Sequence, residues 1–170
     1  MEPDVEIIAR TPDTFSDSDR TRFRDLVIEG GEVGGAVLEG NIANARVLVT
    51  LWAHGAMRGV AALKRPLDSY RAKVAGKTGV ALPKPEIPYE LGYIFIQPDL
   101  RGGGRSHRLV GEALAHADGV AIFATVRTDN GAMRATLGKA GFTAIGNPYP
   151  GQENREIGLL IRPAIPLSQE

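Results

Sequence analysis

A glycine-rich turn in the middle of the chain carries the clearest chemical signal. Three consecutive glycines at 102–104 follow an apolar stretch that ends at Pro98, and Arg101 and Arg105 flank them. After the glycines, apolar residues return at helical spacing, so the turn opens a helix. Glycine lets the backbone approach a ligand closely, and the amino end of a helix favours negative charge. We therefore expect this turn to bind a phosphate or pyrophosphate, with Arg101, Arg105 and Arg108 adding positive charge.

Two familiar phosphate-binding patterns do not fit the turn. The P-loop pattern needs a lysine followed by serine or threonine after its second glycine, and no such pair stands there. The dinucleotide-binding pattern Gly-x-Gly-x-x-Gly fails as well, because His107 stands three residues after Gly104. The turn is therefore another kind of phosphate site, or only a flexible surface turn.

The turn resembles the acyl-coenzyme A loop of the GNAT superfamily of N-acetyltransferases. That loop reads Arg/Gln-x-x-Gly-x-Gly/Ala, and the chain matches it from Arg101 through Gly104 to Ser106. The preceding Ile96-Gln97-Pro98 is similar to the family's apolar-x-Pro that comes before Arg-Gly. Ser106 departs from the usual glycine or alanine, but serine is small and suits the start of a helix.

A second stretch supports the same resemblance. Asn130 follows a predicted strand, a short helix comes next, and Lys139, Gly141 and Phe142 close it as Lys-x-Gly-Phe. This is similar to the family's second coenzyme A element in order and spacing, and the resemblance covers residues 47–161 in element order. It implies acetyl-coenzyme A as cosubstrate and no metal. The cofactor-binding residues that it implies are Ile94, Phe95, Ile96, Arg101, Gly102, Gly103, Gly104, Arg105, Ser106, His107, Asn130 and Met133.

Acetyl transfer from a thioester to an amine needs a base, a group that polarises the carbonyl, and departure of the thiolate. Glu90 is the candidate general base, because the resemblance places it where GNAT enzymes with a strand glutamate carry that residue. The alternative is a salt-bridged carboxylate at the end of a strand. The resemblance also implies that a backbone N–H within residues 94–96 polarises the carbonyl, where the family's strand bulges.

The general acid is where the chain departs from the family. Many GNAT enzymes have a tyrosine seven residues after the position of Asn130, and here Leu137 stands there and cannot donate a proton. Tyr149 is a candidate substitute, although a tyrosine in such a place more often packs. A thiol with a pKa of about 8.5 can also leave unassisted.

These residues indicate an acetyl-coenzyme A-dependent N-acetyltransferase that acts on a primary amine by direct attack. The alternative is a non-catalytic acyl-coenzyme A-binding or regulatory module on the same fold, which Leu137 favours and Glu90 disfavours. A plain interaction domain without a ligand fits least. The acceptor stays open among peptide N-termini, lysine side chains, polyamines, amino acids and aminoglycosides.

Composition narrows the remaining classes. The 170 residues include 20 basic and 20 acidic ones, and this neutral balance disfavours a nucleic-acid binder. The chain has no cysteine, and its three histidines are widely spaced, so we expect no disulfide, thiolate chemistry or metal site. No apolar run approaches a membrane span, and the first residues do not resemble a signal peptide. We expect a cytoplasmic protein whose partner is a small-molecule or peptide amine, and a homodimer is left open.

An α/β domain must position these groups. Besides the central strand that Pro98 ends, strands are predicted over residues 5–10, 46–53, 57–64, 120–127, 142–145 and 156–162. Helices are predicted over residues 16–29, 32–45, 68–77, 106–117 and 130–140. In the second helix, Val33, Ala36 and Val37 would face inward. Residues 147–151 would connect the last two strands, and the tail from residue 163 would fray.

The fold class is therefore α/β, with a mixed central sheet flanked by helices. The resemblance makes this a single GNAT-like acyltransferase domain over residues 1–170. An unusual connection over residues 65–88 interrupts it, with four prolines and several cations. A connection this long between strands is a solvated insertion or a lid over the acceptor site. A further alternative is that its cations form a positive collar for an acidic acceptor: Arg65, Arg71, Lys73, Lys77 and Lys84.

Overall fold

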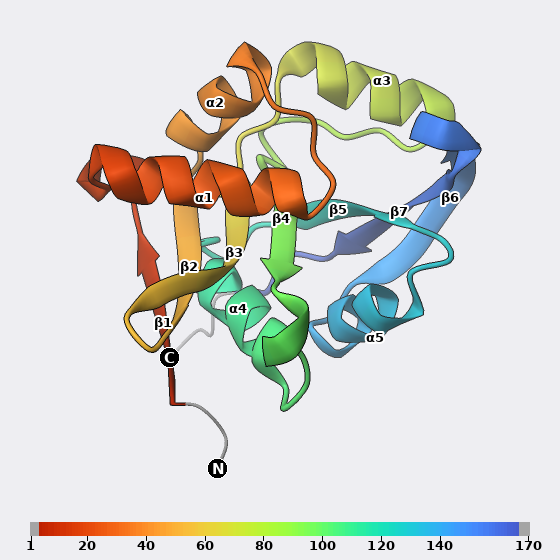
Figure 1. Ribbon diagram of the computed structural model, residues 1–170. Coiled ribbons are helices and arrows are strands. Elements are labelled where there is room, and N and C mark those ends of the chain that lie inside the picture. The colour runs from red at the N-terminus through yellow and green to blue at the C-terminus, as the bar shows by residue number, and fades with distance from the viewer. Residues whose placement is uncertain (1–3, 167–170) are drawn as a thin grey trace. The chain divides into compact units, whose positions relative to one another are not determined.

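The computed structural model describes residues 4–166 (Figure 1). These residues divide into two compact units. The first unit holds residues 4–65 and 91–116, and the second holds residues 66–90 and 117–166. Strand β4 (Tyr89–Ile96) begins in the second unit and continues in the first. The strands hydrogen-bond in the order β1-β2-β3-β4-β5-β7-β6.

The first unit begins with three strands close to the predicted ranges, and they pair antiparallel. β1 (Val5–Arg10) pairs with β2 (Val47–Ala53), and β2 pairs with β3 (Ala56–Lys64). The two-residue turn between β2 and β3 has positive φ values, 51° at His54 and 77° at Gly55. Such a turn matches the natural twist of paired strands and fixes the register of this hairpin.

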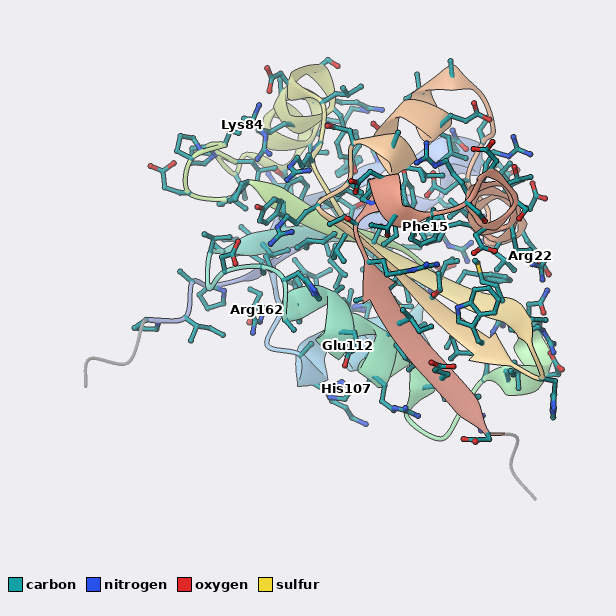
Figure 2. The ribbon with its side chains drawn as sticks, turned by 90° about the vertical axis from the view of Figure 1, so that its left-hand side faces the viewer. Phe15, Arg22, Lys84, His107, Glu112 and Arg162 are labelled. Atoms are coloured by element: carbon teal, nitrogen blue, oxygen red, sulfur yellow. The ribbon has the colours of Figure 1, made fainter. Side chains whose placement is uncertain are left out.

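Helices cover both faces of these strands. α1 (Asp17–Glu29) and α2 (Ala36–Ala43) lie on one face, and α4 (Arg105–Leu114) lies on the other (Figures 1 and 2). α1 begins where predicted, because the Ser16 side chain accepts a hydrogen bond from the Asp19 N–H at 3.1 Å. The buried residues on the α1 and α2 side are Phe15, Phe23, Leu26, Val27, Leu38, Ile42, Ala45, Leu48, Met57, Val60, Ala62 and Tyr93.

The helix α2 is shorter than predicted and buries a different face. It starts directly after Gly35, whose φ of 142° suits glycine and ends the continuity with the preceding residues. Val33 and Val37 are 68% and 67% exposed, and Ala36 is exposed too, so the prediction that these three face inward is wrong. The buried side of α2 consists of Leu38 and Ile42.

The second unit combines the start of β4 with three strands and two helices. The elements are α3 (Asp68–Thr78), β5 (Ile122–Arg127), α5 (Gly131–Lys139), β6 (Thr143–Pro150) and β7 (Glu156–Arg162). β5 pairs in parallel with the first residues of β4, where Glu90 lies opposite Phe123. β7 pairs antiparallel with both β5 and β6. The buried residues between α3 and these strands include Val74, Leu82, Ile87, Phe123 and Leu159.

Strand β6 continues through the residues predicted as a loop. Its pairing with β7 is interrupted between Ile145 and Tyr149 and then resumes, so residues 147–151 do not connect the two strands as predicted. The residues typical of turns lie within this interruption. Gly146 has a φ of 75°, and a Cβ there would lie 2.7 Å from the Thr78 carbonyl oxygen, so only glycine fits at this position. The chain turns only at residues 151–155.

The connection over residues 65–88 is packed through Arg71. The buried Arg71 guanidinium donates hydrogen bonds to the carbonyls of Leu82 at 3.0 Å, Ile87 at 2.7 Å and Pro88 at 3.3 Å. It also lies 5.6 Å from the centroid of the Phe123 ring. Burial lowers the pKa of Arg71. Arg71 therefore ties the segment after α3 to that helix, and it does not belong to an exposed positive collar.

Arg71→Met is expected to lower the free energy of unfolding by about 2–4 kcal/mol, because buried carbonyls lose their charged donor. The matched control is Lys73→Met on the exposed side of the same helix, which should change stability by less than about 0.5 kcal/mol. Urea denaturation of both variants measures the difference. Equal losses in the two variants would contradict the role of Arg71 as an anchor.

The end of the described chain is held in place. The Ile165 N–H donates a hydrogen bond to the Gly119 carbonyl at 2.9 Å, so the predicted tail is attached to the second unit at this residue. The rest of the predicted tail, residues 167–170, lies outside the described residues.

Candidate functional site

The glycine turn has a backbone that other residues adopt only with strain. After β4 ends at Ile96, a single helical turn covers Pro98–Leu100, and then Gly102, Gly103 and Gly104 have φ values of 94°, 64° and 74°. All three angles lie in the left-handed region. The three glycines are therefore required by the shape of the turn, and general flexibility does not explain them.

The turn leaves the start of α4 open to an anion. Gly104 is the residue that caps this helix, and no side chain among the described residues caps its first turn. The N–H groups of Ser106 and His107 lie in the first turn of α4, where the helix itself offers no carbonyl acceptor. The glycines and His107 are exposed, and His107 lies at the beginning of α4 (Figure 2). Backbone donors and the positive end of the helix dipole thus meet at one exposed point.

Two arginines brace the turn. Arg101 Nε donates to the Ile96 carbonyl at 2.8 Å, and its guanidinium carbon lies 5.5 Å from the centroid of the Phe95 ring. Arg105 is buried and donates to the Leu100 carbonyl at 3.1 Å. The charge of Arg105 therefore lies inside the turn, whereas Arg101 and Arg108 are exposed beside it.

A backbone irregularity interrupts β4 before the turn. Tyr93 has a φ of 57°, one residue before the stretch 94–96 where a bulge is expected. A bulky residue in the left-handed region is strained and persists only where its surroundings hold it. The buried Tyr93 side chain is so held: Asn41 Nδ2 donates to its hydroxyl at 3.4 Å, and Lys64 Nζ lies 4.3 Å from its ring centroid.

In the second unit, Glu90 lies in a buried cluster of hydroxyl groups. Glu90 is 2% exposed, and the Tyr70 hydroxyl donates a hydrogen bond to its Oε2 at 2.8 Å. The Tyr70 oxygen and Thr125 Oγ1 are 3.3 Å apart. Because an ionised carboxylate only accepts, Tyr70 donates to Glu90 and Thr125 donates to Tyr70. Three elements, α3, β4 and β5, therefore supply one chain of hydrogen bonds.

Tyr149 belongs to the surroundings of Glu90. It is buried on β6, and burial together with the negative charge of Glu90 raises its pKa. Lys77 Nζ lies 5.6 Å from the centroid of its ring. The structure thus brings together Glu90 and Tyr149, the two residues proposed from the sequence for the chemistry.

The contact between Tyr70 and Glu90 is not predicted from the sequence. The residue lies in α3, in the connection that the sequence predicts as an insertion, where nothing marks it as functional. The available signal is its spacing: Tyr70 and Val74 stand four residues apart, so they share a face of the helix. That face packs into the core of the second unit, and Tyr70 is therefore directed inward.

The second predicted coenzyme A element forms the start of α5. Asn130 caps this helix, because its Oδ1 accepts a hydrogen bond from the Met133 N–H at 3.1 Å. Leu137 faces the interior and is buried. Asn130 and Met133 lie in the second unit with Glu90 and Tyr149. The candidate cofactor residues of the first unit are Ile94, Phe95, Ile96, Arg101, Gly102, Gly103, Gly104, Arg105, Ser106 and His107.

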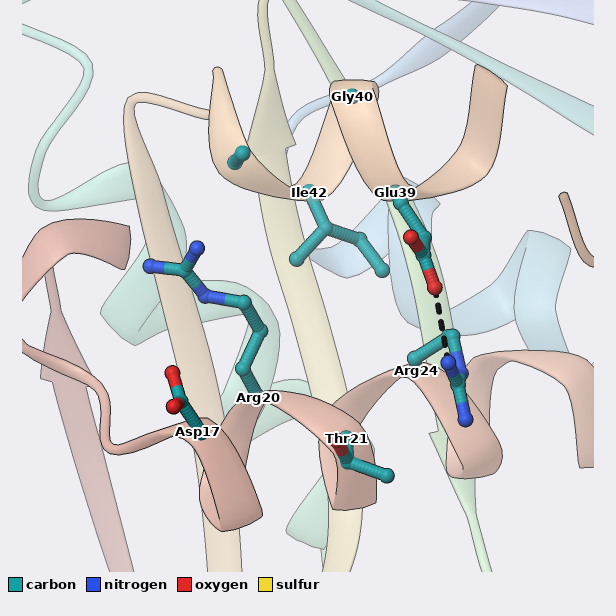
Figure 3. A pocket seen from close by; sticks show the side chains of 8 residues that line it. Asp17, Arg20, Thr21, Arg24, Glu39, Gly40 and Ile42 are labelled. Carbon is teal, nitrogen blue, oxygen red and sulfur yellow. Dashed lines mark hydrogen bonds and ion pairs between the residues drawn. The ribbon is translucent and has the colours of Figure 1, made fainter. Parts of the chain in front are cut away.

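A separate hollow of about 500 Å³ lies between α1 and α2 (Figure 3). The ion pair between Arg24 and Glu39, with 2.8 Å between Nη1 and Oε1, borders it. Arg20 and Ile42 also line it, and Arg20 donates to the Pro12 carbonyl at 2.8 Å. None of the candidate site residues borders this hollow.

Two absences apply to residues 4–166. They contain no group of three or more His, Asp or Glu side chains that could hold a metal ion. They also contain no helix with the length and apolar character needed to cross a membrane.

Sequence comparison finds no family and one short match. No protein-family model matches the chain. A stretch of 62 residues is 42% identical to an uncharacterised protein of Mycobacterium leprae, and it spans 36% of this chain and 17% of that protein. So short a match leaves the activity of this chain to be argued from its own residues.

Comparison by structure identifies the fold. An acyl-CoA N-acyltransferase from Pseudomonas aeruginosa matches 94% of this chain and 99% of its own, with a TM-score of 0.67 and 15% identity. The ribosomal-protein-S18-alanine N-acetyltransferase of Escherichia coli matches 96% and 97%, with a TM-score of 0.64 and 16% identity. A chain of the NatC complex, solved with Gag peptide and CoA, matches 94% and 99%, with a TM-score of 0.66 and 13% identity.

At these identities the likeness establishes the fold alone. The chain has the mixed α/β fold of the GNAT acyltransferases, with a seven-stranded sheet among the described residues. The fold class predicted from the two sequence motifs is confirmed.

Proposed function

We propose that the chain is an acetyl-coenzyme A-dependent N-acetyltransferase that acetylates a primary amine. The observation that carries this proposal is the turn at 102–104, where three left-handed glycines open α4 and no side chain among the described residues caps the helix. The fold supports the same function, because solved structures that share it include N-acyltransferases and a complex with CoA.

The residues of the turn fit the pyrophosphate of coenzyme A. A pyrophosphate needs several donors at close range, and the backbone N–H groups at the start of α4 provide them. Exposed Arg101 and Arg108 would add charge. From the resemblance, Asn130 and Met133 would contact the pantetheine arm. Coenzyme A would supply the acetyl group as a thioester.

Glu90 would act as the general base. An amine acceptor arrives as an ammonium ion without a lone pair, and a carboxylate both attracts that ion and removes its proton, directly or through a water. The freed nitrogen then forms a bond to the acetyl carbon while the carbon–sulfur bond breaks. The nitrogen loses its second proton and the departing thiolate takes up a proton, so the products are the amide and the free thiol of coenzyme A. A backbone N–H next to Tyr93, within residues 94–96, would polarise the carbonyl. Tyr149, whose raised pKa keeps it protonated, would donate a hydrogen bond to the departing thiolate.

One observation favours a second candidate function. Leu137 is buried at the position where many GNAT enzymes carry a tyrosine, so that acid is missing. This supports a non-catalytic acyl-coenzyme A-binding module. Release of free thiol in the presence of amines separates the two candidates, because only the enzyme turns over.

Acetyl-coenzyme A is expected to bind and to raise the melting temperature of the protein. A ligand specific to the folded state stabilises it by about 2.7 kcal/mol at a hundred times its Kd. Thermal unfolding and calorimetry measure this effect, and a panel of amines with thiol detection tests transfer. Pantetheine, which lacks the pyrophosphate, is the control and should stabilise little. Absence of binding at millimolar coenzyme A would rule the proposal out.

A further inference from the structure

Two consecutive residues of α3 hold the beginning of β4. The Tyr70 hydroxyl donates to Glu90 Oε2 at 2.8 Å, and Arg71 donates to the carbonyls of Ile87 at 2.7 Å and Pro88 at 3.3 Å. One residue therefore holds the carboxylate, and the next holds the backbone just before it. The helix α3, which lies in the connection over residues 65–88, is therefore hydrogen-bonded both to Glu90 and to the backbone that precedes it.

The hydrogen bonds at Tyr70 run in one direction. Thr125 Oγ1 lies 3.3 Å from the Tyr70 oxygen and donates to it when Tyr70 donates to the ionised Glu90. Donation to a carboxylate favours its charged form, and a chain of donors strengthens each bond in it. Burial and the negative charge of Glu90 raise the pKa of Tyr70, so Tyr70 stays a donor throughout the neutral and moderately alkaline range.

Glu90 needs such a donor because it is 2% exposed. A carboxylate removed from water takes up a proton unless donors or positive charges compensate for the lost hydration. The titratable and charged groups that act on Glu90 within the second unit are Tyr70 and Arg71 of α3 and Tyr149 of β6. Of these, Tyr70 gives Glu90 a direct hydrogen bond.

We infer that Tyr70 is a positioning residue for the proposed general base: its hydroxyl, itself held by Thr125, orients the Glu90 carboxylate. The inference rests on the proposed function and extends it, because it makes α3 part of the catalytic apparatus. The connection over residues 65–88 then has a role in catalysis, because its helix α3 carries the side chain that holds Glu90.

Tyr70→Phe tests this role, because it keeps the ring and removes only the hydroxyl. We expect kcat to fall about 10- to 100-fold, which is the worth of one hydrogen bond to a charged group. KM for acetyl-coenzyme A should stay the same, since the glycine turn is unchanged. The acid limb of the pH profile of kcat/KM should move to higher pH, because Glu90 loses a donor that favours its ionised form. Thr125→Val should move it in the same direction by less.

The matched control is Tyr149→Phe. This variant also loses one hydroxyl near Glu90, but no hydrogen bond between the two residues is found among the described residues. It should therefore leave the acid limb where it is in the parent, even if kcat changes. A Tyr70→Phe enzyme with the kcat and pH profile of the parent would overturn the inference.

A second measurement separates this inference from the proposed function. The Glu90 carboxyl carbon is followed by NMR during a pH titration, with Glu90→Gln used to assign its signal. An upward shift of its titration in Tyr70→Phe supports the role of Tyr70 even if the parent acetylates no amine, in which case only the proposed function fails. An unchanged titration in Tyr70→Phe overturns the inference whether or not the parent is active.

Discussion

Glu90→Gln is expected to lower kcat by about 10²–10⁴-fold, which is the usual worth of a general base. Affinity for acetyl-coenzyme A should hardly change, because the base acts on the amine and the turn at 102–104 binds the pyrophosphate. Glutamine has nearly the shape of glutamate, and its carbonyl oxygen still accepts the hydrogen bond from Tyr70. Damage to packing is therefore a poor explanation for such a loss. Steady-state assays that detect the released thiol measure kcat, and calorimetry measures the affinity for acetyl-coenzyme A.

The pH profile adds a second criterion for Glu90. The rate of the parent should rise with pH through one ionisation and level off, and the variant should lack that plateau. The loss should shrink at high pH, where more of the amine is already free. Glu86→Gln is the control, since it removes an exposed carboxylate four residues earlier and should leave turnover unchanged. Unchanged turnover and an unchanged profile in Glu90→Gln would mean that Glu90 is structural.

Gly104→Val is expected to weaken acetyl-coenzyme A binding by at least about 100-fold while the fold survives, because a β-branched residue disfavours the left-handed backbone of the turn. A Cβ at Gly104 would meet no protein atom within 4 Å, so the φ of 74° is the constraint within the protein. The turn must rearrange, and its N–H groups would no longer converge. The added side chain would also enter the open space that the proposed pyrophosphate needs.

The chain offers a matched control in the same helix. Gly111 lies within α4, a Cβ there also meets nothing within 4 Å, and its φ is not positive. Gly111→Val should therefore bind acetyl-coenzyme A like the parent. Arg101→Ala should weaken binding less than Gly104→Val, because it removes one charge and one brace and leaves the N–H groups in place. If Gly104→Val binds as tightly as the parent, the turn is not a coenzyme A loop.

Local signals account for the part of the fold that was predicted correctly. The start of α1 follows from Ser16, whose side chain caps the helix, and the start of α5 follows from Asn130 for the same reason. The glycines at 102–104 predict a left-handed turn, because most other residues adopt those backbone angles only with strain. Each of these features depends on residues within a few positions of one another, so each can be predicted from the sequence.

The errors arise where a distant element decides the outcome. The prediction that Val33 and Val37 face inward is wrong because Val33 lies before α2 and packing against the core of the first unit buries Leu38 and Ile42 instead. β6 continues past Ile145 because β7 provides a partner on the far side of the interruption. Neither outcome follows from local turn and helix propensities, since packing and pairing override them.

The candidate phosphate-binding turn and the order of the elements can be predicted from the sequence, because their signals are contiguous along the chain. The choice of Glu90 rests on the resemblance to the GNAT superfamily. The groups that surround Glu90 are known only once the chain has folded. Tyr70 stands 20 positions from Glu90 and 55 positions from Thr125, so their hydrogen bonds exist only after α3, β4 and β5 have packed together. The physical reason is that a buried carboxylate is stabilised by whichever donors the fold brings within reach, and sequence spacing does not record that distance.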